Sequence, residues 1–352
     1  MTVRVDEILF IGIGKTPVCW YRCALPAMHL GADWVGIHMT DDERMPLLHI
    51  VTGLVRNSTI KPNIDDYKVV IVQQPYGKRW FKAINDLRDR GIIVLYEVDD
   101  YLHGVHKQGG HDFSKHYDKK VLPSYELCMR AANGMICSTR YIATRYSKFN
   151  KNMYVCRNGI DMARYRLTKP ERPTVNIGWA GATGHLPALM EWINGGMLDV
   201  MIGRDNTTFI SIGQPQVARA VAQLLGESRA LGIPFTLIES YPAAMTMLDI
   251  ALAPTQTTSW YRGKSDLRWL EAGALGIPLI AAPNIYPEIE HGVTGFHAST
   301  PLEMAEILME LVDDQELRER VGNQAREHMA AHRDMPIAAA QWMEAVEELA
   351  GG

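Results

Sequence analysis

The first half of the chain alternates short apolar runs with amphipathic stretches. The apolar runs, rich in β-branched residues, lie at 8–13, 34–38, 69–73, 92–98, 134–137 and 153–156. Continuous apolar runs are typical of strands that are buried on both faces, as in a parallel sheet covered by helices. The pattern therefore predicts a parallel α/β sheet.

The alternation stops at residues 164–174, which are polar and contain two prolines, and then begins again. This segment is the best candidate for a linker. Further strands are expected at 175–179, 209–213, 235–238, 250–253 and 279–281. We predict two Rossmann-like, doubly wound domains, 1–165 and 174–333, followed by a terminal helix in 334–352 that packs back on the first domain.

Helices are expected in about the last 50 residues. Ser299-Thr300-Pro301 is typical of a helix start, and Met335-Pro336 is expected to open the last helix. Ligands of doubly wound sheets bind outside the carboxyl ends of the strands. Candidate chemistry is therefore sought in the strand-to-helix loops.

Composition narrows the class of protein. The 352 residues are 47% hydrophobic and 22% charged, which suits two ordered domains, and the net charge of -4 implies no general attraction to nucleic acid. The first residues lack an apolar signal segment, and no apolar run reaches the roughly 20 residues that span a bilayer. Five cysteines without CxxC spacing are expected to be reduced core residues. We expect a cytoplasmic protein that is not integral to a membrane.

Two glycines follow the first apolar run, in Gly12-Ile13-Gly14-Lys15-Thr16. The segment is not a P-loop, because that motif would need a glycine where Leu9 stands. Gly12 and Gly14 permit close approach of a ligand or of another backbone, and both alternatives stay open. The next helix carries Arg22, a candidate cation that is otherwise an ordinary surface residue.

Three acids end the fourth predicted strand. Strand alternation directs Glu97 and Asp99 to one face and Asp100 to the other. Clustered carboxylates bind a metal or raise one another's pKa for acid-base work, and helix capping is the alternative. The following segment, 103–119, holds four histidines, beginning with His103, in a spacing that matches no metal site, so we expect a solvated loop there.

The second half begins with a glycine-containing loop in which Gly181, Thr183 and His185 could bind a diphosphate through backbone N–H groups. The strongest block is residues 263–280. There Ser265 is expected to cap a helix, with Lys264 adding positive charge beside the helix N-terminus. Glu271 lies six residues beyond Ser265, about 9 Å along a helix, which is near the span from a diphosphate to its ribose.

The same helix start holds Asp266 and Arg268, which are further candidates for donor contacts. The alternative for Arg268 and Glu271 is an ordinary surface salt bridge.

These motifs together resemble glycosyltransferase family four. The matching segments are Tyr21 to Pro26, Arg157 to Asp161, the block from Lys264 to Pro278, and Pro287 to Phe296. The resemblance implies the GT-B architecture, with two Rossmann-like domains facing a cleft, C-terminal helices, and a UDP- or GDP-linked sugar as co-substrate. It also implies retention of anomeric configuration and no metal or other cofactor.

Residue roles also follow from the resemblance. Glu271 would contact the ribose, and Lys264 stands where the family's first motif Glu would contact the sugar. Asp99 or Asp100 would face the reacting carbon. The chain departs from the family at 182–185, where other members carry an Arg and a Lys for the diphosphate.

The leading hypothesis is a retaining glycosyltransferase. Its expected catalytic residues are Asp99, Asp100 and Lys264. Its expected acceptor residues form a basic and aromatic set that suits a glycan, protein or modified nucleic acid, namely Arg22, Lys78, Arg79 and His103. The alternatives are a nucleotide-sugar-binding protein without transferase activity and an epimerase of the same fold. A dehydrogenase fits less well, because neither half has G-x-G-x-x-G followed by an acid at the usual distance.

Overall fold

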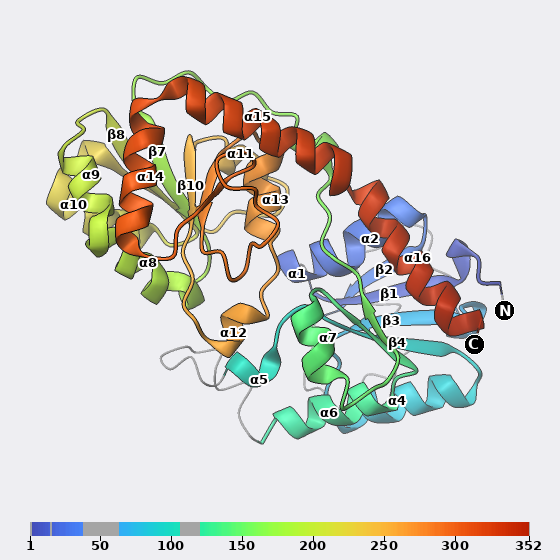
Figure 1. Ribbon diagram of the computed structural model, residues 1–352. Helices are drawn as coiled ribbons and strands as arrows, with labels where there is room; N and C mark the ends of the chain where they lie inside the picture. Colours follow the sequence, from blue (N-terminus) through green and yellow to red (C-terminus); the bar gives the residue numbers. More distant parts are fainter. Residues whose placement is uncertain (1, 15, 38–62, 106–119, 352) are drawn as a thin grey trace. The chain divides into compact units, whose positions relative to one another are not determined.

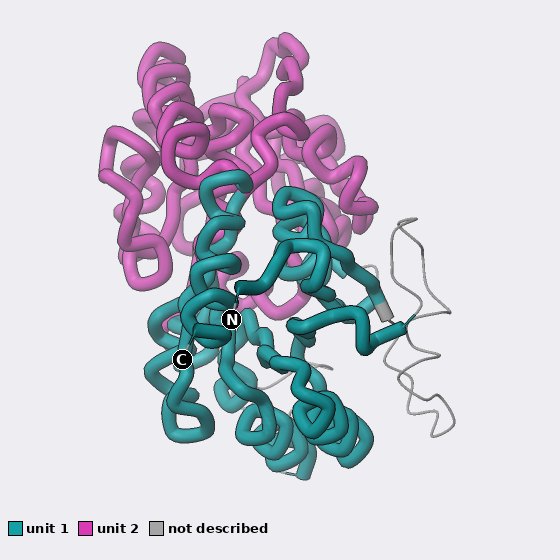
Figure 2. The backbone as a smooth tube through the Cα atoms, turned by 90° about the vertical axis from the view of Figure 1, so that its right-hand side faces the viewer, with its two compact units in different colours: residues 1–159, 258–265, 335–352 teal, residues 160–257, 266–334 magenta. Residues whose placement is uncertain are grey.

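The computed structural model describes residues 2–14, 16–37, 63–105 and 120–351. Contacts divide the chain into two compact units (Figure 2). Unit 1 comprises 1–159, 258–265 and 335–352, and unit 2 comprises 160–257 and 266–334.

Unit 1 is built on a six-stranded parallel sheet in the order β2-β1-β3-β4-β5-β6. Its strands are β1 (Ile8–Ile13), β2 (Asp33–Ile37), β3 (Val69–Gln73), β4 (Ile93–Val98), β5 (Gly134–Cys137) and β6 (Met153–Val155). In register, Phe10 lies opposite Trp34 on one side and Ile71 on the other. Each strand predicted from the apolar runs of the first half is confirmed to within one residue.

Helices cover both faces of this sheet (Figure 1). The helices of unit 1 are α1 (Pro17–Cys19), the π-helix η2 (Trp20–Ala24), α2 (Leu25–Leu30), α4 (Gly77–Asp89), α5 (Leu102–Val105), α6 (Leu122–Ala131), α7 (Arg140–Tyr146), α12 (Ser259–Arg262) and α16 (Met335–Gly351), with short 3-10 turns η1 (Val5–Glu7) and η3 (Ile64–Asp66). Leu9 packs with α4, α6 and α7, whereas Phe10 packs with η2 and α16. This alternation follows from the two-residue period of a strand.

Unit 2 has a second six-stranded parallel sheet, in the order β12-β11-β10-β7-β8-β9. Its strands are β7 (Val175–Ala180), β8 (Thr207–Ile212), β9 (Ala230–Ile233), β10 (Ile250–Ala253), β11 (Leu279–Ala281) and β12 (Phe296–His297). The prediction of a strand at 235–238 is wrong. The edge strand is β9, and Phe235 and Leu237 beyond it are 71% and 72% exposed, so their apolar character did not mark a buried strand.

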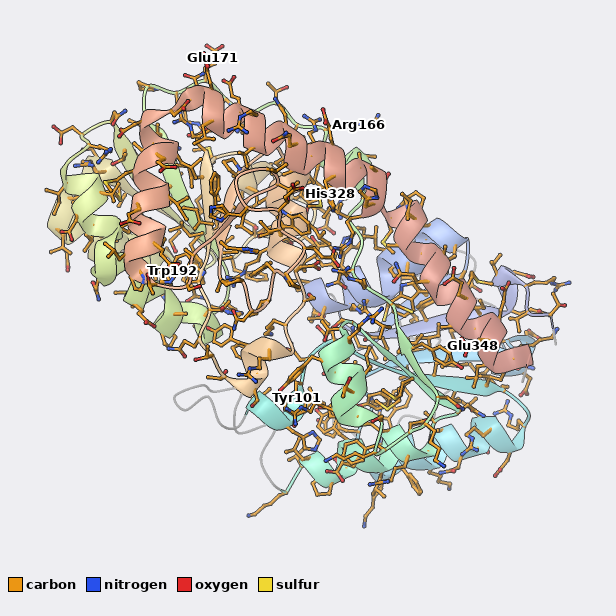
Figure 3. The ribbon with its side chains drawn as sticks, viewed as in Figure 1. Tyr101, Arg166, Glu171, Trp192, His328 and Glu348 are labelled. Carbon is orange, nitrogen blue, oxygen red and sulfur yellow. The ribbon has the colours of Figure 1, made fainter. Side chains whose placement is uncertain are left out.

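The helices of unit 2 surround this sheet (Figure 1). They are η6 (Met162–Tyr165), η7 (Thr183–His185), α8 (Leu186–Trp192), the π-helix η8 (Ile193–Met197), α9 (Leu198–Ile202), α10 (Pro215–Leu225), η9 (Glu227–Arg229), α11 (Tyr241–Met245), α13 (Leu267–Ala274), α14 (Pro301–Asp313) and α15 (Gln315–His332). Thr300 Oγ1 accepts a hydrogen bond from Glu303 N–H at 3.1 Å, which confirms the helix start expected there. Trp192, labelled in Figure 3, lies in the core with strand residues of β7 and β8.

The unit boundaries differ from the expected domain limits at residues 258–265. The second domain was expected to run without interruption from 174 to 333, but this segment groups with unit 1. Close backbone packing explains the difference. A Cβ atom added to Gly104 would lie 2.8 Å from Trp260 N, and one added to Gly263 would lie 2.7 Å from Tyr101 Cβ.

The C-terminal helix α16 also groups with unit 1. Trp342 packs against Phe10 of β1, with 5.5 Å between the ring centroids. The five cysteines are buried and free. Within the ranges that the structure describes, no helix combines the length and the apolar character needed to cross a bilayer.

Candidate functional site

A buried ion pair lies at the end of β4 in unit 1. Arg22 Nε donates to Glu97 Oε1 at 2.6 Å, and both side chains are essentially inaccessible. The Arg22 guanidinium also donates to Cys156 O and Asn158 Oδ1, at 2.7 and 2.9 Å, and packs on the Trp342 ring. The expectation that Arg22 contacts an acceptor disagrees with this burial. Instead, Arg22 joins η2, β4 and α16 inside unit 1.

Burial and pairing act in opposite directions on Glu97. Desolvation raises the pKa of its carboxyl, and the Arg22 guanidinium opposes that rise. Sequence alternation placed Glu97 beside Asp99, but their surroundings differ, because Glu97 lies in the core and Asp99 is half-buried beyond the strand end.

Asp99 follows β4 and is held from two sides. Gln74 Nε2 donates to Asp99 Oδ1 at 2.5 Å, and Ser138 Oγ donates to the Asp99 carbonyl at 2.8 Å. Burial, followed by the charges of Asp100 and Glu97, raises the pKa of Asp99 to about 8. A carboxyl with this pKa is largely protonated at neutral pH, so Asp99 can donate a hydrogen bond.

Asp100 is paired with Lys264 within unit 1. Lys264 Nζ lies 2.8 Å from Asp100 Oδ1 and 2.9 Å from Oδ2, and it sits over the Trp260 ring at 4.2 Å from the centroid. Lys264 was expected to add charge at a helix N-terminus. In the structure its ammonium group forms an ion pair with Asp100, because residues 258–265 pack in unit 1.

The expected helix start at Ser265 is also wrong. α13 begins at Leu267 with Asp266 at its N-cap position. Ser265 Oγ instead accepts a hydrogen bond from Asn158 Nδ2 at 2.8 Å. The error arises because a serine marks only a possible cap, whereas Asn158, far away in the sequence, determines where this hydroxyl binds.

Asp266 is committed to an ion pair in unit 2. Its two carboxylate oxygens accept from Arg333 at 2.7 and 3.0 Å, and both side chains are only 7% exposed. Arg333 also lies 3.2 Å from Glu288. The expected donor contact of Asp266 is not supported, because its oxygens already bind a buried guanidinium.

Arg268 lies beside the loop that follows β7. Its guanidinium carbon is 5.4 Å from the centroid of the Trp179 ring, and a Cβ added to Gly181 would lie 2.5 Å from Arg268 Nη2. Gly213, after β8, has a φ of +92°, and a Cβ there would lie 2.7 Å from Gly181 O. The glycines thus let two strand-end loops and an arginine approach one another.

Two other residues of this loop were predicted to bind the donor. Thr183 is exposed, and His185 is half-buried and ends the η7 turn, where its N–H donates to Ala182 O at 3.1 Å. Thr183 and His185 thus remain positioned near the carboxyl end of β7, on the same loop as Gly181.

Glu271 is buried on α13. It is 5% exposed, and its Oε2 accepts a hydrogen bond from Tyr241 Oη at 3.1 Å. Burial and the Glu271 charge raise the pKa of Tyr241 well above its usual value, so the phenol stays a donor. Glu271 is therefore not the ordinary surface residue of the alternative interpretation.

Gly12, near the end of β1, and Gly14, directly after it, serve packing. A Cβ on Gly12 would lie 2.3 Å from Cys19 Sγ, and Gly14 has a φ of +56°. These constraints account for both glycines without a ligand. Their expected donor contact stays a prediction.

The remaining acceptor candidates differ in their surroundings. Lys78 and Arg79 are exposed in the first turn of α4. His103 is less accessible, because Nδ1 lies 3.2 Å from Tyr146 Oη and Nε2 lies 3.0 Å from Glu126 Oε1. Figure 3 shows Tyr101 beside α5, where it stacks on His103. Both ring nitrogens of His103 thus bond within unit 1, which leaves neither for an acceptor in this arrangement.

Some residues of the segments considered in the sequence lie outside the described residues. They are Lys15 and the histidines His106, His111 and His116. In the part of the chain that is described, no group of three or more His, Cys, Asp or Glu side chains is arranged to hold a metal ion.

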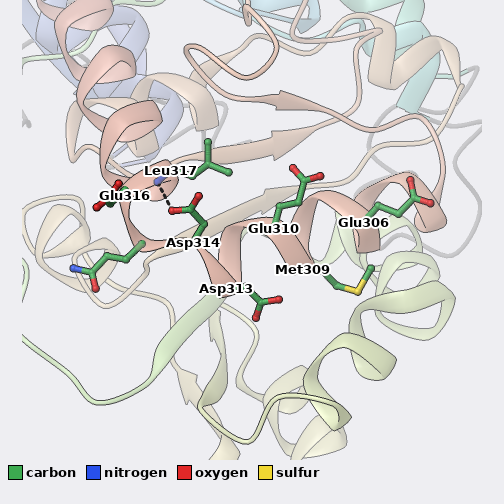
Figure 4. Close-up of a pocket in the computed structure, with 8 residues that line it drawn as sticks. Glu306, Met309, Glu310, Asp313, Asp314, Glu316 and Leu317 are labelled. Atoms are coloured by element: carbon green, nitrogen blue, oxygen red, sulfur yellow. Dashed lines mark hydrogen bonds between the residues drawn. The ribbon is translucent and has the colours of Figure 1, made fainter.

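A surface hollow at the junction of α14 and α15 lies apart from these residues (Figure 4). Its lining is mostly acidic and consists of Glu306, Met309, Glu310, Asp313, Asp314, Gln315, Glu316 and Leu317. Asp314 Oδ1 accepts from Leu317 N–H at 2.9 Å and caps α15, as the dashed line in Figure 4 shows. No candidate donor, catalytic or acceptor residue lines this hollow.

Sequence reasoning missed Gln74, Tyr241 and Trp179. Gln73 ends the apolar strand β3 and Gln74 directly follows it, and this pair of amides is a signal that could have been noticed. Tyr241 opens a short helix and had no such signal, because its importance comes from a contact with α13.

Comparisons with known proteins match part of the sequence and the fold. Residues 232–344 match a family described as glycosyl transferase-like. No curated protein sequence matches the chain.

Several solved structures share the fold. The chain is similar to the Anabaena HepE crystal structure in complex with UDP and glucose, with a TM-score of 0.68 and 15% identity over 97% of this chain and 99% of that chain. It is also similar to a glycosyltransferase from Rickettsia africae, with a TM-score of 0.63 and 12% identity over 97% and 98%. A putative UDP-N-acetylglucosamine 2-epimerase from Listeria monocytogenes is similar with a TM-score of 0.56 and 14% identity over 97% and 96%.

Proposed function

We propose that the chain, a glycosyltransferase of the GT-B fold and group 1 type, moves a sugar from a UDP-sugar to a hydroxyl acceptor with retention of anomeric configuration. The match at 232–344 includes all of α13, which carries the donor candidates Arg268 and Glu271. The crystal structure of HepE, which shares the fold, contains UDP and glucose. The UDP in that structure supports UDP over GDP as the nucleotide.

The observation that carries the proposal is the arrangement of Arg268 and Glu271 on α13. Arg268 lies beside Gly181 and Trp179, and Glu271, three residues further along the helix, is buried beside Tyr241. Three residues correspond to a rise of about 4.5 Å along the helix, a fitting separation for groups that bind adjacent parts of one nucleotide. We assign the diphosphate to Arg268 and the amides of Ala182 and Thr183, because the N–H groups of Gly181 and His185 already donate to Ile212 O and Ala182 O. We assign the ribose hydroxyls to Glu271.

In the proposed reaction, the bond from the sugar C1 to the diphosphate oxygen breaks while the acceptor oxygen bonds to C1 on the same face. The acceptor proton moves to the departing phosphate oxygen. Arg268 and backbone N–H groups stabilise the charge that grows on the diphosphate. This assignment needs no metal and no other cofactor.

The sugar-facing groups are assigned to unit 1. Asp99, which is half-buried and raised in pKa, would bind a sugar hydroxyl, and Asp100 would act with Lys264 as a neutralised pair. Lys264 is engaged with both carboxylate oxygens of Asp100, whereas Arg268 lies beside the loop that follows β7. We therefore favour Arg268 over Lys264 as the diphosphate cation.

An epimerase is the second candidate, because the putative epimerase from Listeria monocytogenes shares the fold across nearly the whole of both chains. A nucleotide-sugar-binding protein without turnover is the third. We place the protein in the cytoplasm in this proposal because its five cysteines are buried free thiols.

Calorimetric titration with UDP and GDP tests the nucleotide assignment first. Release of UDP from a panel of UDP-sugars, with and without hydroxyl acceptors and in excess chelator, then tests the reaction. We expect UDP binding and chelator-resistant, acceptor-stimulated release. Conversion of the sugar without an acceptor would favour the epimerase, tight binding without turnover would favour the binding protein, and activity restored only by manganese or magnesium would contradict metal independence.

A further inference from the structure

Gln74 has an uncommon backbone conformation for its residue type. It directly follows β3 and has a φ of +43°, and it is the only non-glycine with positive φ among the residues that the structure describes. A left-handed conformation costs about 1–2 kcal/mol for a residue with a side chain. Such strain is often found at functional sites, where the surroundings hold it in place.

The contacts of Gln74 separate a backbone role from a side-chain role. Its backbone N–H donates to Glu97 O at 2.8 Å, and its Nε2 donates to Asp99 Oδ1 at 2.5 Å. A glycine would keep the first hydrogen bond and remove the strain. Only the side-chain amide can make the second.

The two acids after β4 are held in different ways. Lys264 lies within hydrogen-bond distance of both carboxylate oxygens of Asp100. Asp99 accepts a hydrogen bond from Gln74 at Oδ1 and another from Ser138 at its backbone carbonyl. Within the described part of the chain, its Oδ2 accepts no hydrogen bond. One oxygen of a half-buried carboxyl is therefore available for a ligand.

We propose that Gln74 is a positioning residue that holds Oδ1 of Asp99 so that Oδ2 is presented to a hydroxyl of the donor sugar. This inference rests on the proposed function, because it needs a sugar at the end of β4. Gln74 acts through Asp99 and does not itself contact the sugar.

The groups around Asp99 determine the direction in which its pKa should change when Gln74 is replaced. Asp100 and Glu97 raise the pKa of Asp99, whereas Lys264 and Arg22 lower it. An amide N–H that donates to a carboxylate favours the ionised form. Loss of the Gln74 amide should therefore raise the pKa of Asp99 above its value of about 8.

The first measurement needs no catalytic activity. Carbon-13 NMR of protein labelled at aspartate side chains, with the Asp99 signal assigned by Asp99→Asn, follows the titration directly. In Gln74→Gly we expect the Asp99 midpoint to rise by about one pH unit, with unchanged or higher thermal stability because glycine tolerates the backbone conformation. Gln74→Leu should give the same rise with lower stability. An unchanged midpoint in folded Gln74→Gly would overturn the proposal.

The second measurement uses transfer from the UDP-sugar that the wild type accepts. In Gln74→Gly we expect the pH profile of kcat/KM to move upward with the NMR midpoint, the KM for the UDP-sugar to rise, and the affinity for UDP alone to stay within about twofold of wild type. A displaced midpoint with an unchanged KM and pH profile would show that Oδ2 does not meet the sugar and would overturn the proposal.

The two proposals fail in distinguishable ways. A wild type without transfer activity contradicts the proposed function, while the NMR midpoint still decides whether Gln74 controls Asp99. An active enzyme whose Asp99 midpoint ignores Gln74 contradicts only the inference about Gln74.

Discussion

Glu271 and Arg22 show how burial gives charged residues different tasks. Glu271 is buried on α13 and accepts a hydrogen bond from the phenol of Tyr241. Arg22 faces a carboxylate, Glu97, and two further oxygen acceptors. A buried carboxyl on a helix can accept hydrogen bonds from the hydroxyls of a polar ligand, whereas an arginine paired with a buried carboxylate holds the chain together.

Glu271→Gln should therefore weaken UDP binding without changing the fold. The amide has nearly the same shape but lacks the negative charge, and hydrogen bonds to charged groups contribute about 1.5–3 kcal/mol. We expect the dissociation constant for UDP, measured by calorimetry, to rise on the order of 10- to 100-fold. Glu310→Gln, an exposed position on α14, is the matched control. Equal affinities of the two variants would remove Glu271 from the donor site.

Arg22→Met should destabilise the protein by about 3–5 kcal/mol, because it leaves Glu97 buried without its partner. Adding Glu97→Gln to the same chain should recover part of this loss. Urea denaturation of the wild type, both single variants and the double variant measures the coupling. Additive effects would show that the pair does not act as a unit.

At the scale of elements, the sequence predicted what depends on local pattern. The apolar runs located β1, β3, β5, β10 and β11 at their observed bounds. β9 was missed because Ala230 and Gly232 give a weak strand signal at an edge, while exposed Phe235 and Leu237 gave a false one. A strand is recognised from the burial of its residues, and residue type alone does not determine burial.

The site shows the same limit. Glu271 was predicted from its spacing on a helix, and it is buried on α13. The partners of Arg22, Ser265 and Lys264 could not be predicted, because each lies more than 70 residues away in the sequence. Such pairs are decided by the packing of whole elements.

Gly104→Ala tests the packing of α5 against residues 258–265. The added Cβ would lie 2.8 Å from Trp260 N and 2.9 Å from Trp260 Cα, which are backbone atoms that cannot turn aside. Overpacking typically costs about 1–3 kcal/mol. We expect faster hydrogen exchange across 258–265 and faster tryptic cleavage after Arg262 and Lys264. Gly351→Ala, where nothing lies within 4 Å, is the control. If both variants exchange alike, the close approach is not what holds this segment.

At the scale of the whole molecule, the repeated strand–helix alternation predicted two parallel sheets, and the structure has them. That pattern did not predict that residues 258–265 group with unit 1, because no local feature distinguishes this segment from its neighbours. Charge is also unevenly distributed. Residues 121–159 contain six Lys and Arg and a single acid, Glu126, in a chain whose net charge is -4. Unit 1 is thus the more suitable unit for an anionic acceptor.

The salt dependence of transfer tests this assignment of the acceptor. Lys78 and Arg79 are exposed at the start of α4, and contacts with a polyanion release counterions. If the acceptor is a modified nucleic acid, its KM should rise steeply between about 50 and 200 mM salt. Lys78→Ala with Arg79→Ala should reduce the log-log slope by up to about 1.4–1.8, since each phosphate contact contributes roughly 0.7–0.9. UDP affinity should not change.

Arg320→Ala with Arg326→Ala, two exposed positions on α15, removes the same charge from unit 2 and is the matched control. An equal loss of slope in both double variants would mean that only net charge matters and that α4 is not the acceptor surface. Transfer that is flat across this salt range and unaffected by the loss of Lys78 and Arg79 would point to a neutral glycan or a protein hydroxyl, because such acceptors release no counterions when they bind.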